Sequence, residues 1–179
     1  ILVAMTPHDI RYMARTTDEA FNKTFAFQWQ RKKDNSPVYD WQEFTSSMLS
    51  IPMAHQMATN YIILDGTPKR QMIKVMRPYQ VYAASSIIDK VRQHNFDIDP
   101  QGIGYVWHAT GSGKTISSFK TAWLASRLPN VDKVVFLVDR VALTNQTVDE
   151  YSAYDPEKAE NGSGGVVTDA SNRWVLSRK

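Results

Sequence analysis

Residues 104–128 read GYVWHATGSGKTISSFKTAWLASRL, and a compact Gly-Ser-Gly-Lys-Thr turn lies within this stretch at 111–115. The turn follows an apolar run of strand length and precedes a segment with helical composition, so we expect a strand–turn–helix junction here. Glycine adopts backbone conformations that other residues avoid, which lets several N–H groups of a tight turn converge on one anion. The start of the helix adds unpaired N–H groups and the positive end of its dipole. The stretch therefore predicts a site for the phosphates of a nucleotide.

Each residue of the turn has an expected role in such a site. Lys114 is expected to reach the β- and γ-phosphate oxygens, and the Thr115 hydroxyl is expected to ligate Mg²⁺. The expected cofactors are therefore ATP and Mg²⁺, with Lys114 and Thr115 as the catalytic residues. The residues predicted to bind the nucleotide through this turn are Thr110, Gly111, Ser112, Gly113, Lys114 and Thr115. The alternative is a chance Gly-rich turn, which the flanking strand and helix signals argue against.

One position departs from the strict form of this motif. The full pattern has a further glycine five residues before Gly113, at position 108, where this chain has His108. Small-molecule kinases and GTP switches often keep that glycine, whereas helicase-type motors often do not. The departure therefore favours a motor.

The region around the turn has the rhythm of an α/β fold. Hydrophobic patterning predicts strands at 103–107 and 133–138, and helices at 114–127 and from about Val141 to Tyr151. A strand, a helix and a second strand in this order form a right-handed crossover unit with a parallel sheet. We therefore expect the α/β class with a parallel sheet.

A second signal lies upstream, in the sequence RPYQ at 77–80. Pro78 is expected to open a helix in which Val81, Ala84, Ile88 and Val91 form one apolar stripe. A glutamine amide can accept a hydrogen bond from the adenine N6 group while donating one to N7. Gln80 is therefore predicted to select ATP, although an ordinary helix start is the alternative.

Polar residues that follow the second predicted strand form a third signal. Asp139 and Arg140 end the strand, and Gln146 lies on the next helix. Ligands of open α/β folds bind at the carboxyl edge of the sheet. We therefore expect Asp139, Arg140 and Gln146 to contact DNA, with a solvated strand–helix joint as the alternative.

The first 76 residues lack the alternation of strands and helices seen further along and instead predict short elements separated by turns. Residues 1–16 predict a strand, a turn at Thr6–Asp9 and a second strand. Residues 31–37 read as a polar loop, and Asp65-Gly66-Thr67-Pro68 is a strong turn signal. A helix is expected at 41–50, with one buried face formed by Trp41, Phe44 and Met48.

Composition limits the class of protein. The chain has 21 basic and 18 acidic residues, a small excess that permits a nucleic-acid partner without requiring one. Cysteine is absent, so a reducing cytoplasm is expected, and no apolar run approaches the roughly 20 residues that a membrane helix needs. The chain begins with Ile1 in place of an initiator Met, so a fragment of a longer protein is expected.

These motifs carry a resemblance to a known family. The string VWHATGSGKTISSFKTAWLASRL, followed by VDKVVFLVDRVALTNQT and preceded by MRPYQ, resembles the motor (R) subunit of Type I restriction enzymes, which are superfamily-two helicase-like translocases. The opening ILVAMTPHDIRYMARTT resembles the closing strands of that family's nuclease domain. The resemblance implies nuclease strands at 1–16, a connector at 17–76 and the first part of a RecA-like ATPase domain at 77–179.

The resemblance also implies an activity and partners. It implies ATP-driven translocation along double-stranded DNA, coupled to cleavage by a PD-(D/E)xK nuclease domain, in a complex with methyltransferase and specificity subunits. The family's Walker B carboxylates, arginine finger and nuclease carboxylates find no match within 1–179, so this segment is expected to turn ATP over very slowly. The alternatives are another superfamily-two helicase or translocase, a P-loop small-molecule kinase, or an interaction module with a vestigial loop.

Overall fold

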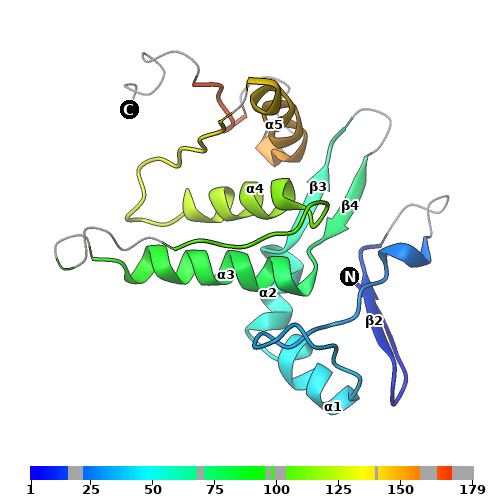
Figure 1. Cartoon of the computed structure of the whole chain (residues 1–179). Coiled ribbons are helices and arrows are strands. Elements are labelled where there is room, and N and C mark those ends of the chain that lie inside the picture. Colours follow the sequence, from blue (N-terminus) through cyan, green and yellow to red (C-terminus); the bar gives the residue numbers. More distant parts are fainter. Residues whose placement is uncertain are drawn as a thin grey trace. The chain divides into compact units, whose positions relative to one another are not determined.

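The computed structural model describes residues 1–15, 22–67, 71–95, 98, 104–139, 141–157 and 165–170. The chain divides into two compact units (Figure 1). The first contains Ile1–Ile63 and Ile73–Val135, and the second contains Leu64–Met72 and Phe136–Lys179. The domain boundaries expected at 16/17 and 76/77 remain predictions.

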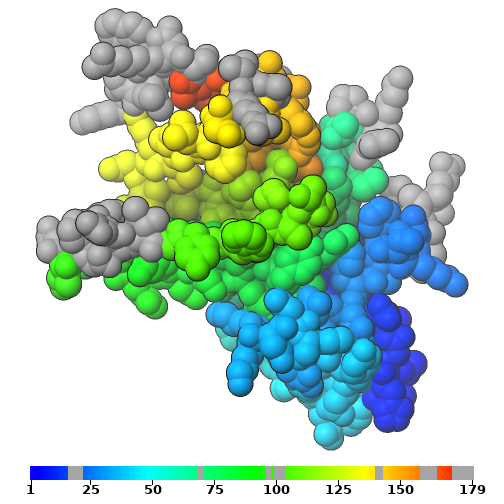
Figure 2. Space-filling model, in the orientation of Figure 1, coloured from blue at the N-terminus to red at the C-terminus, as the bar shows by residue number. Residues whose placement is uncertain are grey.

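The first unit opens with a β-hairpin. Strand β1 (Leu2–Met5) pairs antiparallel with β2 (Ile10–Met13), with Leu2 opposite Met13. The Thr6 hydroxyl accepts the Asp9 N–H at 2.9 Å and thereby closes the turn, which confirms the predicted strand, turn and strand. Residues of β1 are exposed, whereas Ile10 and Tyr12 of β2 are fully buried. In Figure 2 the dark-blue hairpin lies against the lighter blue residues that follow it.

An aromatic cluster joins this hairpin to the rest of the unit. The Tyr12 ring packs edge-on against Phe27 and Trp29, and Trp29 packs edge-on against Tyr82. The Tyr12 hydroxyl donates to the Met76 carbonyl at 2.9 Å. Burial raises the pKa of Tyr12 well above its usual value, with Tyr82 as a further cause, so the hydroxyl stays protonated and remains a donor.

Short helices follow the hairpin: η1 (Lys23–Phe25), α1 (Trp41–Phe44), the π-helical turn η2 (Thr45–Leu49) and α2 (Met53–Thr59). The Asp40 side chain caps α1 by accepting the Glu43 N–H at 2.8 Å. Phe44 and Met48 are buried as predicted, but Trp41 is 46% exposed. The prediction for Trp41 was wrong: Trp41 is the first residue of α1, and the buried face of the helix begins only at Phe44.

Strands β3 (Ile62–Asp65) and β4 (Met72–Val75) form a second two-stranded sheet. The Asp65 carboxylate accepts the Thr67 N–H at 3.0 Å and the Thr67 hydroxyl at 2.5 Å. This contact confirms the predicted turn as far as Thr67, while Pro68 lies outside the described residues. The expected polar loop at 31–37 is also present, with a turn at 32–34.

Helices α3 (Pro78–Gln93) and α4 (Lys114–Ala125) pack against each other and position the loop between them (Figure 1). Both helices were predicted from the sequence. Val81, Ala84 and Ile88 of α3 are buried, and Val91 is half-buried, which confirms the apolar stripe. The loop expected at 97–102 lies largely outside the described residues.

The second unit contains α5 (Val141–Tyr154), close to the helix predicted there. The Phe136 and Tyr151 rings lie 5.4 Å apart between centroids. The buried Asp155 carboxylate accepts the backbone N–H groups of Glu157, at 3.0 Å, and of Val166, at 2.7 Å. Asp155 therefore ties the end of α5 to the segment 165–170.

The predicted strands at 103–107 and 133–138 are not formed. Residues 104–107 and 133–138 are neither helix nor strand in the described chain, while residue 103 lies outside it. Tyr105 and Trp107 are each 90% exposed, and Leu137 is 91% exposed. The apolar runs are real, but a run becomes a strand only when another strand satisfies its N–H and C=O groups. The described sheets are β1–β2 and β3–β4, and the parallel sheet that we expected is not among them.

Candidate functional site

The Gly-rich turn forms a loop that leads directly into α4. Gly111 and Gly113 have φ values of +76° and +80°, in the left-handed region that favours glycine. Gly113 is the residue before the helix, and α4 begins at Lys114. The Ser117 N–H donates to the Gly113 carbonyl at 3.1 Å, whereas the N–H groups of the first turn have no partner within the helix. The loop therefore has the backbone form that an anion site requires.

Two side chains of α3 hold one carbonyl of this loop. The Tyr79 hydroxyl donates to the Ser112 carbonyl at 2.9 Å, and Gln80 Nε2 donates to the same oxygen at 2.8 Å. Both contacts join residues more than thirty positions apart in the sequence. The structure therefore brings Gln80 to the predicted loop.

The Gln80 amide is engaged at both ends. Its Oε1 atom accepts the Arg77 N–H at 2.9 Å, which caps the start of α3. These two partners fix which end of the amide is oxygen, because Arg77 offers a donor and Ser112 an acceptor. Gln80 is 4% exposed, and its contacts with the described residues leave one lone pair and one N–H of the amide for a further partner. Its contacts with the loop and with Arg77 were not foreseen from the sequence.

Lys114 extends from the first position of α4 across the loop. Its Nζ atom lies 3.2 Å from the Ala109 carbonyl and 3.5 Å from the His108 carbonyl. Lys114 is an exposed residue, so a ligand bound by the loop could reach its side chain. Thr115 follows at the second position of the helix and is partly buried. Thr110 and Gly111 are exposed on the loop.

His108 belongs to this site, whereas the sequence identified it only as a departure from the motif. Its Nδ1 atom lies 3.1 Å from the Ser112 hydroxyl, and its ring packs edge-on to Tyr79 with centroids 6.2 Å apart. Burial, and then the charge of Lys114, lower the pKa of His108 below its usual value. The neutral ring adds no second cation beside Lys114 at neutral pH. Its place four residues before Ser112 was the signal that could have revealed it.

The residues predicted to contact DNA belong to the second unit. Asp139 is exposed, and the Gln146 amide donates to the Glu150 carboxylate at 2.9 Å, one turn further along α5. Arg140 lies outside the described residues. The role of these three residues remains a prediction.

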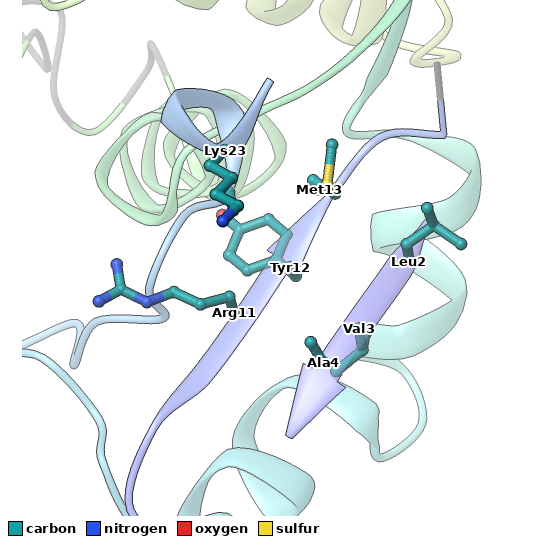
Figure 3. A pocket seen from close by; sticks show the side chains of 8 residues that line it. Leu2, Val3, Ala4, Arg11, Tyr12, Met13 and Lys23 are labelled. Atoms are coloured by element: carbon teal, nitrogen blue, oxygen red, sulfur yellow. The ribbon is translucent and has the colours of Figure 1, made fainter. Parts of the chain in front are cut away.

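A pocket of about 490 Å³ lies beside the N-terminal hairpin (Figure 3). Its lining is largely apolar and includes Leu2 and Val3 of β1, Tyr12 and Met13 of β2, and Lys23. It shares no residue with the loop at 108–115. Among the described residues, no group of three or more His, Asp or Glu side chains could hold a metal ion.

Helices long and apolar enough to cross a membrane are absent from the described part of the chain.

Comparison with known proteins identifies the protein family to which the chain belongs. A family model described as "Type III restriction enzyme, res subunit" matches residues 73–174, more than half of the chain. The matched range contains Gln80, the Gly-rich loop and the whole of α5. The chain therefore belongs to this family, whose members carry a helicase-like domain.

The relatives narrow the class to Type I restriction enzymes. The chain is 35% identical over 146 residues to the Type I restriction enzyme SsaAORF53P endonuclease subunit of Staphylococcus saprophyticus. It is 34% identical over 146 residues to the SauCOLORF180P endonuclease subunit of Staphylococcus aureus. Each match covers 82% of this chain but 15% of the relative. The resemblance to Type I restriction endonuclease subunits is thus confirmed.

Proposed function

We propose that this chain supplies the ATP-binding part of the R subunit of a Type I restriction enzyme, which moves along double-stranded DNA and cleaves it. The observation that carries the proposal is the loop 108–113, with two left-handed glycines followed at once by Lys114 and Thr115. Membership of a restriction-enzyme family supports the same assignment. The expected cofactors are ATP and Mg²⁺.

The residues present fit these cofactors. The N–H groups of the first turn of α4 and those of the loop from Thr110 to Gly113, apart from Ser112, would bind the phosphates, because unpaired N–H groups and a helix dipole favour an anion. The Ser112 N–H donates to the Ala109 carbonyl at 3.3 Å. Lys114, an exposed residue whose ammonium lies 3.2 Å from the Ala109 carbonyl of the loop, would bind the β- and γ-phosphates. The Thr115 hydroxyl would ligate Mg²⁺. When bound, the metal neutralises phosphate charge during hydrolysis.

Gln80 is the residue proposed to select adenine. Its amide would use the lone pair and the N–H that remain after its contacts with Arg77 and Ser112. The contact with Ser112 supports this role, because it fixes the amide beside the phosphate loop. Asp139, Arg140 and Gln146 are proposed to contact the DNA backbone.

The domain organisation belongs to the same proposal. We propose that 1–16 closes a nuclease domain, that 17–76 is a connector, and that 77–179 begins a RecA-like domain with a parallel sheet. The exposed apolar side chains at 105, 107 and 137 support strands there, since an apolar run so exposed calls for a covering partner. Methyltransferase and specificity subunits are the proposed partners, and the cytoplasm the proposed location.

Slow hydrolysis by the 179-residue chain is part of the proposal. Phosphoryl transfer depends on a residue that orients the attacking water and on an arginine that neutralises the developing charge. We assign neither role within this chain. We therefore expect binding of ATP with negligible turnover, and robust DNA-stimulated hydrolysis by the isolated chain would contradict this part.

The test is a binding measurement on the 179-residue chain. Isothermal titration with Mg²⁺–ATP should detect binding, and Lys114→Ala should weaken it at least tenfold, because the ammonium group forms charge-assisted contacts with the phosphates. Lys90→Ala is the matched control, since Lys90 is an exposed lysine in the last turn of α3, whereas the contacts with the loop come from its first turn. Equal affinity of Lys114→Ala and the wild-type chain would instead support an interaction module with a vestigial loop.

A further inference from the structure

We propose that Tyr79 is a positioning residue of the phosphate loop: together with Gln80 it orients the Ser112–Gly113 peptide so that the Gly113 N–H faces the phosphates. The inference rests on the proposed nucleotide site, and it assigns a role to a residue that the sequence motif leaves without one. It begins with the two hydrogen bonds to the Ser112 carbonyl, at 2.9 Å from Tyr79 and at 2.8 Å from Gln80.

The hydroxyl hydrogen of Tyr79 has one available direction. Arg77 NH1 donates to the Tyr79 oxygen at 3.2 Å, and a guanidinium can only donate. The Tyr79 oxygen is therefore an acceptor toward Arg77, which leaves its own hydrogen for Ser112. The Arg77 guanidinium is itself placed over the Phe27 ring, 4.9 Å from the centroid. Arg77 thus holds Tyr79 as a donor to the loop.

The geometry of the peptide unit carries this constraint to the next residue. In a trans peptide the C=O of one residue and the N–H of the next point in opposite directions across one plane. With the Ser112 carbonyl held by Tyr79 and Gln80 on α3, the Gly113 N–H points away from α3. A flipped peptide would instead present the Ser112 carbonyl oxygen to the phosphates, and the partial negative charge of that oxygen would repel the phosphate oxygens.

The first turn of α3, which holds this peptide, is anchored by buried residues and lies directly beside Gly113. Tyr79 and Gln80 lie in the first turn of α3, which Pro78 opens and whose Val81 and Ala84 are fully buried. A Cβ atom placed on Gly113 would collide with Gln80 Nε2. The peptide is therefore fixed from one side by α3, which leaves its other side to the ligand.

The test separates the phosphates from the base. Mg²⁺–tripolyphosphate has no base, so its affinity for the 179-residue chain reports only the loop. Tyr79→Phe keeps the ring and removes one donor to Ser112, and a single hydrogen bond of this kind corresponds to about a fivefold loss. We expect tripolyphosphate and ATP to lose affinity by the same factor, with the ratio of ATP to GTP affinity unchanged.

Tyr82→Phe is the matched control. Tyr82 lies on the same helix and its hydroxyl also donates to a backbone carbonyl, that of Gln30 at 2.5 Å. Its loss should lower stability without changing tripolyphosphate binding. Amide hydrogen exchange adds a measurement without any ligand: residues 109–116 should exchange faster in Tyr79→Phe than in Tyr82→Phe.

The outcomes distinguish the two proposals. A wild-type chain that binds neither ATP nor tripolyphosphate overturns the proposed function. A wild-type chain that binds both, with Tyr79→Phe binding tripolyphosphate equally well and exchanging residues 109–116 at the wild-type rate, overturns the positioning role alone. A selective loss of phosphate affinity in Tyr79→Phe, with Tyr82→Phe unchanged, supports it.

Discussion

At the scale of single residues, the two glycines of the loop are under different constraints. Both Gly111 and Gly113 have positive φ values, so any side chain at either position pays the cost of the left-handed conformation. A Cβ atom at Gly111 would meet nothing within 4 Å, whereas one at Gly113 would collide with Gln80 Nε2. The motif requires glycine at 113 and leaves position 111 variable, and the contact with α3 gives a physical reason for that difference.

This difference predicts the result of two matched substitutions. Gly111→Ala should cost about 1 kcal/mol of unfolding free energy, from the backbone conformation alone. Gly113→Ala should cost more, because Gln80 must also move and release the Ser112 carbonyl. Urea denaturation measures both, and adding Gln80→Ala to Gly113→Ala should recover part of the excess. Equal costs for the two alanine variants would show that Gln80 does not approach Gly113 closely.

At the scale of elements, one buried lysine joins α4 to β3. Lys120 is 6% exposed, and its Nζ atom donates to the Ile62 carbonyl at 2.8 Å while lying 4.2 Å from the centre of the Trp123 ring. Arg127 lies over the same ring at 4.0 Å. The helix that begins at the Gly-rich loop is thereby attached to strand β3. The sequence indicates a helix here but gives no sign that a lysine on it is buried.

The burial of Lys120 predicts a pH-dependent stability. Burial, and then the charge of Arg127, lower the pKa of Lys120 to about 8, from 10.5 for an ordinary lysine. Between these pH values the unfolded chain binds more protons than the folded chain, so the free energy of unfolding gains a favourable contribution as pH rises from about 8 toward 10.5. The contribution should be on the order of 1 kcal/mol, because solvent screening reduces the full linkage.

Comparison with Lys120→Met isolates this contribution. Thermal denaturation of both proteins across this pH range should show the wild-type chain gaining stability relative to the variant. The tyrosines titrate in both proteins and cancel in the difference. A constant difference between the two stabilities from neutral to alkaline pH would mean that Lys120 is solvated in the folded chain.

At the scale of the whole molecule, two apolar runs with the composition of strands pair with no other strand in the described part of the chain. Residues 104–107 and 133–138 have the composition of buried strands, yet Tyr105, Trp107 and Leu137 are almost fully exposed. The chain spans 15% of the length of the staphylococcal relatives. A parallel sheet needs several strands brought together by crossovers, and their hydrogen bonds exist only when neighbouring strands are in place.

These exposures predict how the isolated chain tolerates substitution. Trp107→Ser should change the free energy of unfolding by less than about 0.5 kcal/mol, because the side chain is already in water. Phe119→Ala, on the buried face of α4, should cost about 3–5 kcal/mol. Denaturant titration of both variants checks the contrast. A cost for Trp107→Ser as large as that for Phe119→Ala would show that the Trp107 side chain is buried in the folded chain.

Local patterns determined much of this protein from the sequence alone. The hairpin at 1–16, the helices α3, α4 and α5 and the phosphate loop were all predicted, because helical periodicity, turn residues and left-handed glycines act over a few neighbouring residues. The tertiary structure alone decided that Tyr79 and Gln80 hold Ser112, that Lys120 is buried against Ile62, and that Trp41 and Trp107 face solvent. The three contacts join residues 32 to 58 positions apart in the sequence. The exposure of the two tryptophans depends on which other parts of the chain pack beside them. Packing determines such relations, and no local sequence pattern encodes them.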